Sequence, residues 1–179
     1  MYPGCLNSFN LIVSTSRFRE EQAQDEILNI LEMFDDLESE CEITPIKGIL
    51  LAQTALDPFS VIEKLKEVVA SEPWQVRYIL RVLPIEVVVP TYLDAIKEAT
   101  KELASKMHAD DTFRITVEKR HSSFSSIQVI NAVAGEIRNK VDLEDPDWVV
   151  LIEIVASKTG ISVIQPEQIF SSVIEKRGE

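Results

Sequence analysis

The chain has 179 residues, 45% of them hydrophobic, and its formal net charge is −12 at pH 7. A chain of this length can bury roughly 70% of its unfolded surface, which predicts a real core in one large or two small domains. It has no run of about 18 apolar residues to cross a membrane and no basic region typical of a signal peptide, and its acidity argues against indiscriminate nucleic-acid binding. We therefore expect a cytoplasmic protein with neither a membrane nor DNA as its partner.

Residues suited to cofactor or metal chemistry are sparse. The five glycines are too scattered for a Gly-rich phosphate loop, so no nucleotide cofactor is expected. Cys5, Cys41, His108 and His121 do not have the spacing of a metal site. A nucleophilic pair of His121 with one of the serines at 122–126 stays an alternative, but no nucleophile-elbow motif accompanies it. We expect no metal, no cofactor and no enzymatic activity.

The first half of the chain is predicted to alternate strands and helices. The predicted elements are, in order, a strand at 9–15, a helix at 19–37, a hairpin at 41–54, a helix at 57–71 and a strand at 74–83. Asp57 followed by Pro58 is typical of a helix start, and Pro45 and Gly48 supply the turn of the hairpin. This order indicates a ferredoxin-like βαββαβ domain over residues 1–84.

Charge is unevenly distributed in this half. Residues 20–42 hold ten acids and no Lys or Arg, which indicates either a solvated helix face or a surface for a basic protein partner. Arg77 and Arg81 are predicted to share one face of the last strand. Pairing with the acidic helix, or packing of their aliphatic stems, is the favoured interpretation for both arginines, with RNA contact as the alternative. For Trp74 and Trp148, packing beside a strand is favoured over base stacking.

The second half is predicted to form a mixed α/β layer. The predicted elements are a stiff, packed linker at 85–90, a helix at 91–107, a strand at 112–119, a helix begun by the serines at 122–126, strands at 148–155 and 161–164, and a last helix from 166. Thr91 with Asp94 resembles a capping box. The serine-capped helix would bury the side chains of Ile127, Ile130, Ala134, Ile137 and Val141. The apolar strand at 148–155 would lie parallel to the strand at 112–119.

The only local surplus of positive charge lies between residues 112 and 140, a stretch that contains five basic and two acidic residues. Lys119, Arg120 and His121 end the strand there, and the serines that follow can cap the next helix. The first amides of a helix lack internal partners and its dipole favours an anion, so a phosphate would fit beside these cations. The alternative interpretation is that the serines only cap the helix and that the cations are solvated.

Several of these stretches resemble a known pair of domains. FRITVEKR, the serine-containing helix start and VDLEDPDWVVLIEIV resemble the THUMP domain, an RNA-binding module of tRNA-modifying proteins. FNLIVSTSR, KGILLAQTALDP and LRVLPIEVVV resemble the ferredoxin-like domain and linker that accompany it. The resemblance implies an α+β chain with a ferredoxin-like domain at 1–84, a packed linker at 85–90 and a THUMP domain at 91–179.

THUMP domains are usually fused to a catalytic domain, and none is expected after residue 179. This organisation resembles the stand-alone tRNA acetyltransferase adaptor, which helps a separate RNA acetyltransferase to make N4-acetylcytidine. The resemblance therefore implies a non-catalytic chain with two partners, tRNA and an RNA acetyltransferase on another chain. The alternatives are a detached RNA-binding subunit for tRNA methylation or thiolation, and an acidic protein-interaction module without a direct RNA role.

In that family the RNA surface engages the acceptor stem and its single-stranded end. The positions that match its motif are Lys119, Arg120 and the serines that open the next helix, with Arg138 and Lys140 as weaker candidates. The complete set of candidate RNA-binding residues is Arg77, Arg81, Lys119, Arg120, His121, Ser123, Ser125, Ser126, Arg138 and Lys140.

Overall fold

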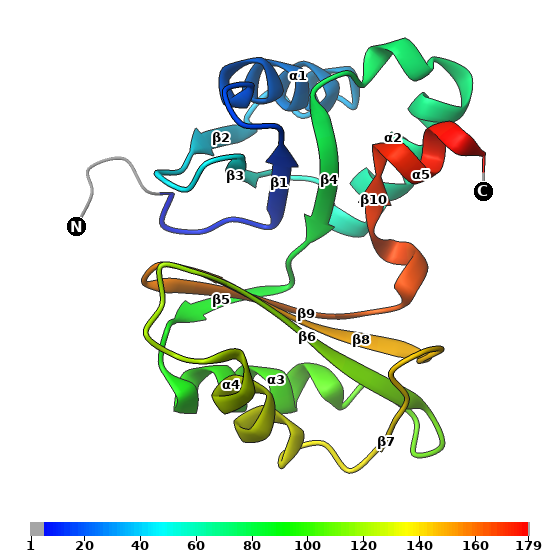
Figure 1. The fold of residues 1–179 in the computed structure, drawn as a ribbon. Coiled ribbons are helices and arrows are strands. Elements are labelled where there is room, and N and C mark those ends of the chain that lie inside the picture. The colour runs from blue at the N-terminus through cyan, green and yellow to red at the C-terminus, as the bar shows by residue number, and fades with distance from the viewer. Residues whose placement is uncertain (1–5, 179) are drawn as a thin grey trace. The chain divides into compact units, whose positions relative to one another are not determined.

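A computed structural model describes residues 6–178, and the chain divides into two compact α+β units (Figure 1). Unit 1 comprises Met1–Pro84 together with Glu167–Glu179, and unit 2 comprises Ile85–Pro166. These units differ in two places from the domains expected at 1–84, 85–90 and 91–179. The expected linker is part of unit 2, and the C-terminal residues return to unit 1.

Unit 1 is a five-stranded antiparallel sheet with helices. Its elements are β1 (Leu11–Thr15), α1 (Glu20–Met33), β2 (Glu40–Ile43), β3 (Ile49–Gln53), α2 (Pro58–Ser71), the 3-10 helices η1 (Pro73–Gln75) and η2 (Pro166–Gln168, which spans the unit boundary), β4 (Ile79–Pro84), β10 (Phe170–Ser171) and α5 (Ser172–Arg177). The strands lie in the order β10-β4-β1-β3-β2, and every neighbouring pair is antiparallel. The expected order of the first six strands and helices and the expected hairpin are confirmed.

Both long helices of unit 1 contribute to one core. Buried side chains of α1, such as Ile27 and Leu31, and of α2, such as Leu65, pack in the same cluster as Leu11 and Val13 of β1. Alternate residues of a strand point to the same face, so this cluster defines one covered face of the sheet. Asp57 caps α2 as expected, because its side chain accepts the Ser60 N–H at 2.9 Å.

Two expected boundaries in unit 1 were wrong. The strand expected at 74–83 begins only at Ile79: residues 73–75 form η1, and the carboxylate of Glu26 on α1 accepts the backbone N–H groups of Arg77, Tyr78 and Ile79. The helix expected from 166 is instead η2, β10 and the short α5. Phe170 is fully buried and pairs with Val82 of β4, which fixes an extended backbone there.

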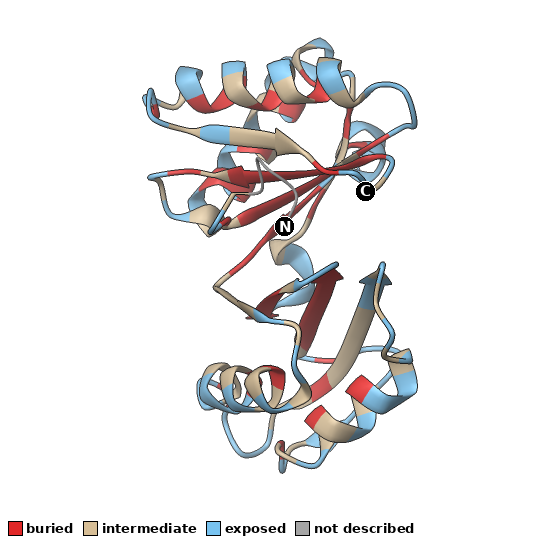
Figure 2. Ribbon diagram, turned by 90° about the vertical axis from the view of Figure 1, so that its left-hand side faces the viewer, coloured by how far each residue is buried: buried red, intermediate tan, exposed pale blue. Residues whose placement is uncertain are grey.

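Unit 2 is a mixed sheet with two helices. Its elements are β5 (Val87–Pro90), α3 (Leu93–Ala104), β6 (Thr112–Arg120), α4 (Ser126–Ala134), β7 (Lys140–Val141), β8 (Trp148–Val155) and β9 (Lys158–Ile164). The strands lie in the order β5-β9-β8-β6-β7, with β6 parallel to β7 and β8, and β9 antiparallel to β8 and β5. The expected parallel pairing of β6 with β8 is confirmed. Figure 2 shows the burial of β8 and β9 along nearly their whole length.

Helix starts and faces in unit 2 depart from the sequence patterns in two places. The Thr91 hydroxyl bonds the Ala156 carbonyl and the Thr159 hydroxyl, so it is not available as a cap, and α3 begins after Tyr92 without a side-chain cap. Helix α4 buries Val129 and Val133, whereas Ile127 is exposed. Both rows have helical spacing, so the spacing alone does not determine which row faces the sheet.

Val141 is also exposed, since α4 ends at Ala134 and Val141 lies in β7, while Ile137 is buried as expected. Within residues 6–178 the structure contains no helix of the length and apolar character that a membrane span requires.

Candidate nucleic-acid interface

The turn between β6 and α4 holds the centre of the predicted site. His121 has a φ of 54°, which turns the chain at the end of β6, and the Ser122 hydroxyl accepts the Phe124 N–H at 3.2 Å. Ser125 caps α4 in a complete capping box: its hydroxyl accepts the Gln128 N–H at 3.1 Å, and the Gln128 side chain accepts the Ser125 N–H at 2.8 Å. The expected serine cap is therefore confirmed and assigned to Ser125.

The start of α4 retains open donors. Among residues 6–178, no acceptor is found for the backbone N–H groups of Ser126 and Ile127. Lys119 is exposed, and its ammonium donates to the Phe124 carbonyl at 3.1 Å, which holds it over this turn. Backbone donors, the exposed Ser123 and one full charge thus converge where an anion is favoured by the helix dipole. We name this group, Lys119, His121, Ser123, Ser125 and Ser126, the α4 turn.

Arg120 does not belong to the α4 turn. Neighbouring residues of a strand point to opposite faces, and Arg120 lies opposite to Lys119. Its guanidinium donates to the Glu153 carboxylate of β8 at 2.8 Å, and Glu153 is only 2% exposed. Arg120 is half-buried and is engaged by an ion pair with a buried carboxylate, on the strand face opposite to Lys119, and not beside Lys119 as expected.

Arg138 and Lys140 lie at the other end of β6. Lys140 of β7 pairs with Thr112, the first residue of β6. Lys119 is seven residues further along this strand, roughly 23 Å at the usual rise per residue. Both cations are exposed, and Lys140 lies beside Asp142, whose pKa is lowered chiefly by backbone N–H donors from Asp145 and Glu144. They form a separate basic position and not an extension of the α4 turn.

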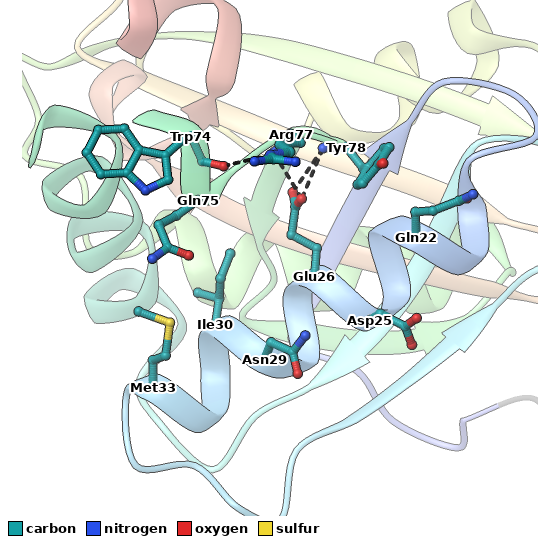
Figure 3. A pocket seen from close by; sticks show the side chains of 10 residues that line it. All are labelled: Gln22, Asp25, Glu26, Asn29, Ile30, Met33, Trp74, Gln75, Arg77 and Tyr78. Carbon is teal, nitrogen blue, oxygen red and sulfur yellow. Dashed lines mark hydrogen bonds between the residues drawn. The ribbon is translucent and has the colours of Figure 1, made fainter. Parts of the chain in front are cut away.

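Arg77 and Arg81 belong to unit 1 and do not share a strand. Arg77 precedes β4, and its guanidinium donates to the Trp74 carbonyl at 3.0 Å (Figure 3). Its backbone, rather than its guanidinium, is bonded by Glu26 of the acidic helix at 2.9 Å. Arg81 lies within β4 between Ser14 and Ser171 and is exposed. The expectation that Arg77 and Arg81 share one face of a strand was therefore wrong.

The two tryptophans differ. Trp148 packs against the core of unit 2, and its indole N–H donates to Asp111 at 2.8 Å. The pKa of Asp111 is lowered by the His108 backbone N–H and by this indole, so the carboxylate that bonds Trp148 stays charged at neutral pH. Trp74 is 60% exposed, contrary to the packing expected for it.

Within residues 6–178 no three His, Cys, Asp or Glu side chains are grouped closely enough to hold a metal ion. Burial, and secondarily Glu42, raises the pKa of the Cys41 thiol to about 12, so this thiol is protonated at neutral pH. Cys5 lies outside the described residues.

One basic group, in the loop from β1 to α1, was not among the predicted site residues. Arg17, Phe18 and Arg19 lie in this loop, and Lys47 lies close to the Phe18 ring. The available signal in the sequence was an aromatic residue between two arginines immediately before the acidic helix.

Comparison with known proteins identifies the domain that contains the α4 turn. Residues 90–164 match the THUMP domain family. THUMP domain-containing protein 1 of Bos taurus is 25% identical to the chain over 132 residues, which cover 68% of this chain and 37% of that protein. The chain spans about two fifths of the length of the curated relatives that it matches.

Solved structures share the fold. The structure of PH1313 from Pyrococcus horikoshii superposes with a TM-score of 0.68 at 17% identity and covers 88% of this chain and 55% of its own. A 4-thiouridine synthetase in complex with RNA and ATP superposes with a TM-score of 0.55 at 13% identity, covering 92% of this chain and 42% of its own. From the family match, and from the mixed sheet that carries the α4 turn, residues 90–164 of this chain are a THUMP domain.

Proposed function

We propose that this chain is a non-catalytic, tRNA-binding adaptor that presents tRNA to a separate RNA acetyltransferase for N4-acetylcytidine formation. The observation that carries RNA binding is the THUMP domain, since THUMP domains bind RNA in tRNA modification. The α4 turn supplies the chemistry, because open N–H groups, hydroxyls and the Lys119 ammonium are suited to a phosphate of the RNA backbone.

We further propose that unit 1 is the ferredoxin-like partner of the THUMP domain. The βαββαβ order, the strand order β4-β1-β3-β2 and the common core under α1 and α2 support this assignment. The 4-thiouridine synthetase in complex with RNA shares the fold of this chain, which is compatible with RNA as the ligand here.

Lys119→Glu tests the α4 turn directly. The variant should bind tRNA about tenfold more weakly, and the slope of log affinity against log salt should fall by about 1, because one phosphate contact is lost. The measurement is a titration of labelled tRNA at several salt concentrations. Lys119 is exposed, so the thermal midpoint should not change.

Lys140→Glu is the matched control, since it makes the same charge change on the same domain at the far end of β6. The proposal requires that Lys119→Glu weakens binding more than Lys140→Glu. Equal losses in the two variants would show a general effect of net charge and would contradict a site at the α4 turn.

Mass spectrometry of tRNA nucleosides from a deletion strain tests the modification. The adaptor function predicts selective loss of N4-acetylcytidine. Loss of a methylated or thiolated nucleoside instead would support the alternative, a detached subunit for another modification.

A second candidate function, docking of a basic protein segment, is favoured by an open pocket of about 370 Å³ in unit 1 (Figure 3). The pocket lies along the acidic helix α1, and its lining includes Trp74, Met33 and Asp25, with Trp74 60% and Met33 55% exposed. Trp74→Ala should weaken binding of the acetyltransferase in a pull-down while leaving tRNA affinity unchanged. Undiminished acetyltransferase binding by Trp74→Ala would argue against this pocket.

A further inference from the structure

The loop between β1 and α1 presents an aromatic ring to solvent in an unfavourable backbone conformation. Phe18 has a φ of 67° and is 80% exposed. The left-handed region costs a bulky residue free energy, and the contacts of the folded chain must hold it there. An asparagine or glycine would adopt this conformation more easily. A phenylalanine at this position thus has a conformational cost and does not contribute to the core.

A neighbouring turn holds the loop in place. The Thr15 N–H donates to the Gly48 carbonyl at 2.9 Å, and the Gly48 N–H donates to the Glu20 carboxylate at 2.8 Å. Gly48 has a φ of 77°, and a Cβ there would lie 2.7 Å from the Thr15 carbonyl oxygen, so only glycine permits this approach. The β2–β3 turn is thereby fixed against the start of α1.

These hydrogen bonds of Gly48 place the neighbouring Lys47 close to the Phe18 ring. The Lys47 ammonium lies 5.8 Å from the centroid of Phe18, within the range of a cation–π interaction. The same contacts occupy the Glu20 carboxylate, because backbone N–H donors, its own and that of Gly48, lower the pKa of Glu20. The ring and the ammonium therefore lie side by side on the surface of unit 1.

The charge of this surface is opposite to that of unit 1 as a whole. Residues 16–19 and 45–48 contain Arg17, Arg19 and Lys47 and no acid, whereas unit 1 has nine basic against seventeen acidic residues. Arg17 and Arg19 are exposed, and neither makes an ion pair with any residue from 6 to 178. We name Arg17, Phe18, Arg19 and Lys47 the Phe18 platform.

We propose that the Phe18 platform is a second RNA contact, which binds a single-stranded nucleotide by stacking its base on Phe18 and placing its phosphates against Arg17 and Arg19. Exposed aromatics flanked by cations bind single strands in this way without sequence preference, since every base offers a stacking face. In a duplex the base faces are already stacked, so the platform selects an unpaired segment. The inference rests on the proposed function for its ligand, RNA, but uses residues of unit 1 alone.

The test is a fluorescence titration of the full chain with a short, labelled oligouridylate, an unstacked single strand. Phe18→Ala should weaken this binding roughly tenfold, because the base loses its stacking partner. Phe18→Trp should bind like the wild type, because it keeps an aromatic ring at this position. The matched control is Leu37→Ala, which removes a side chain of similar exposure, 78%, from the same unit and should bind like the wild type. Equal binding by Phe18→Ala and the wild type would overturn the proposal.

Phe18→Asn separates a ligand role from a structural one. If the ring serves RNA, Phe18→Asn loses oligouridylate binding while its thermal midpoint is unchanged or raised, because asparagine tolerates the left-handed backbone. A lowered midpoint with unchanged oligouridylate binding would show that Phe18 only packs against Lys47. Failure of the proposed function would be seen separately, as unchanged tRNA affinity in Lys119→Glu, whereas only the Phe18 variants decide the platform.

Discussion

Arg120→Ala should lower the free energy of unfolding of unit 2 by about 3 kcal/mol, because it leaves the buried Glu153 carboxylate without its guanidinium partner. The two groups are 2.8 Å apart, and Glu153 is 2% exposed. Urea denaturation followed by the fluorescence of Trp148, in a Trp74→Phe background, measures the loss in unit 2. An exposed cation without such a partner would change stability by only a few tenths of a kcal/mol.

The double variant Arg120→Leu with Glu153→Leu is the control. Apolar residues in place of both charges should recover most of the lost stability, since neither charge then stays buried. Full stability of Arg120→Ala alone would contradict the structural role assigned to this pair. The two cations at the end of β6 should therefore have different roles. Substitution of Arg120 should lower stability, and substitution of Lys119 should lower RNA affinity.

Phe170→Ala should destabilise unit 1 by about 3 kcal/mol, since it leaves a cavity in the core that α1, α2 and β4 share. Phe170 is completely buried, although it lies beyond the THUMP domain in the sequence. Hydrogen exchange read by mass spectrometry should show faster exchange in β4 and α2, with β6 and β8 unchanged.

Val173→Ala is the control for Phe170, because Val173 is 48% exposed and its truncation should cost less than about 0.5 kcal/mol. Faster exchange confined to unit 2 in Phe170→Ala would contradict the assignment of the C-terminal segment to unit 1.

The sequence patterns predicted the regular elements well and the irregular ones poorly. Alternation at 112–119 specified β6, because a period of two is typical of a strand, and the apolar run at 148–155 indicated β8 by its short length and its β-branched residues. The bonding of residues 77–79 to Glu26 and the occupation of Thr91 by Ala156 were not predictable, since both partners are distant in sequence. Tertiary contacts outweighed local signals at both positions.

The candidate site was predicted in outline. The Lys119 ammonium bonds the carbonyl of Phe124, the residue before the Ser125 cap, so it lies at the helix start as expected for a consecutive strand and helix. The predicted position of the Arg120 side chain was wrong. The alternation of a strand already implied that Arg120 and Lys119 point to opposite faces. Its partner was not recognised, because Glu153 lies within an apolar run. The Phe18 platform depends on a turn about thirty residues away, so its residues alone did not reveal it.

The return of the chain to unit 1 through β10 has a consequence for synthesis on the ribosome. Unit 2 is continuous in sequence, whereas the sheet of unit 1 is completed only by the pairing of Phe170 with Val82 across the whole of unit 2. Domains generally fold as units in the order in which they emerge. Here the later unit can complete its core first, and the sheet of the N-terminal unit has to wait until β10 has left the ribosome.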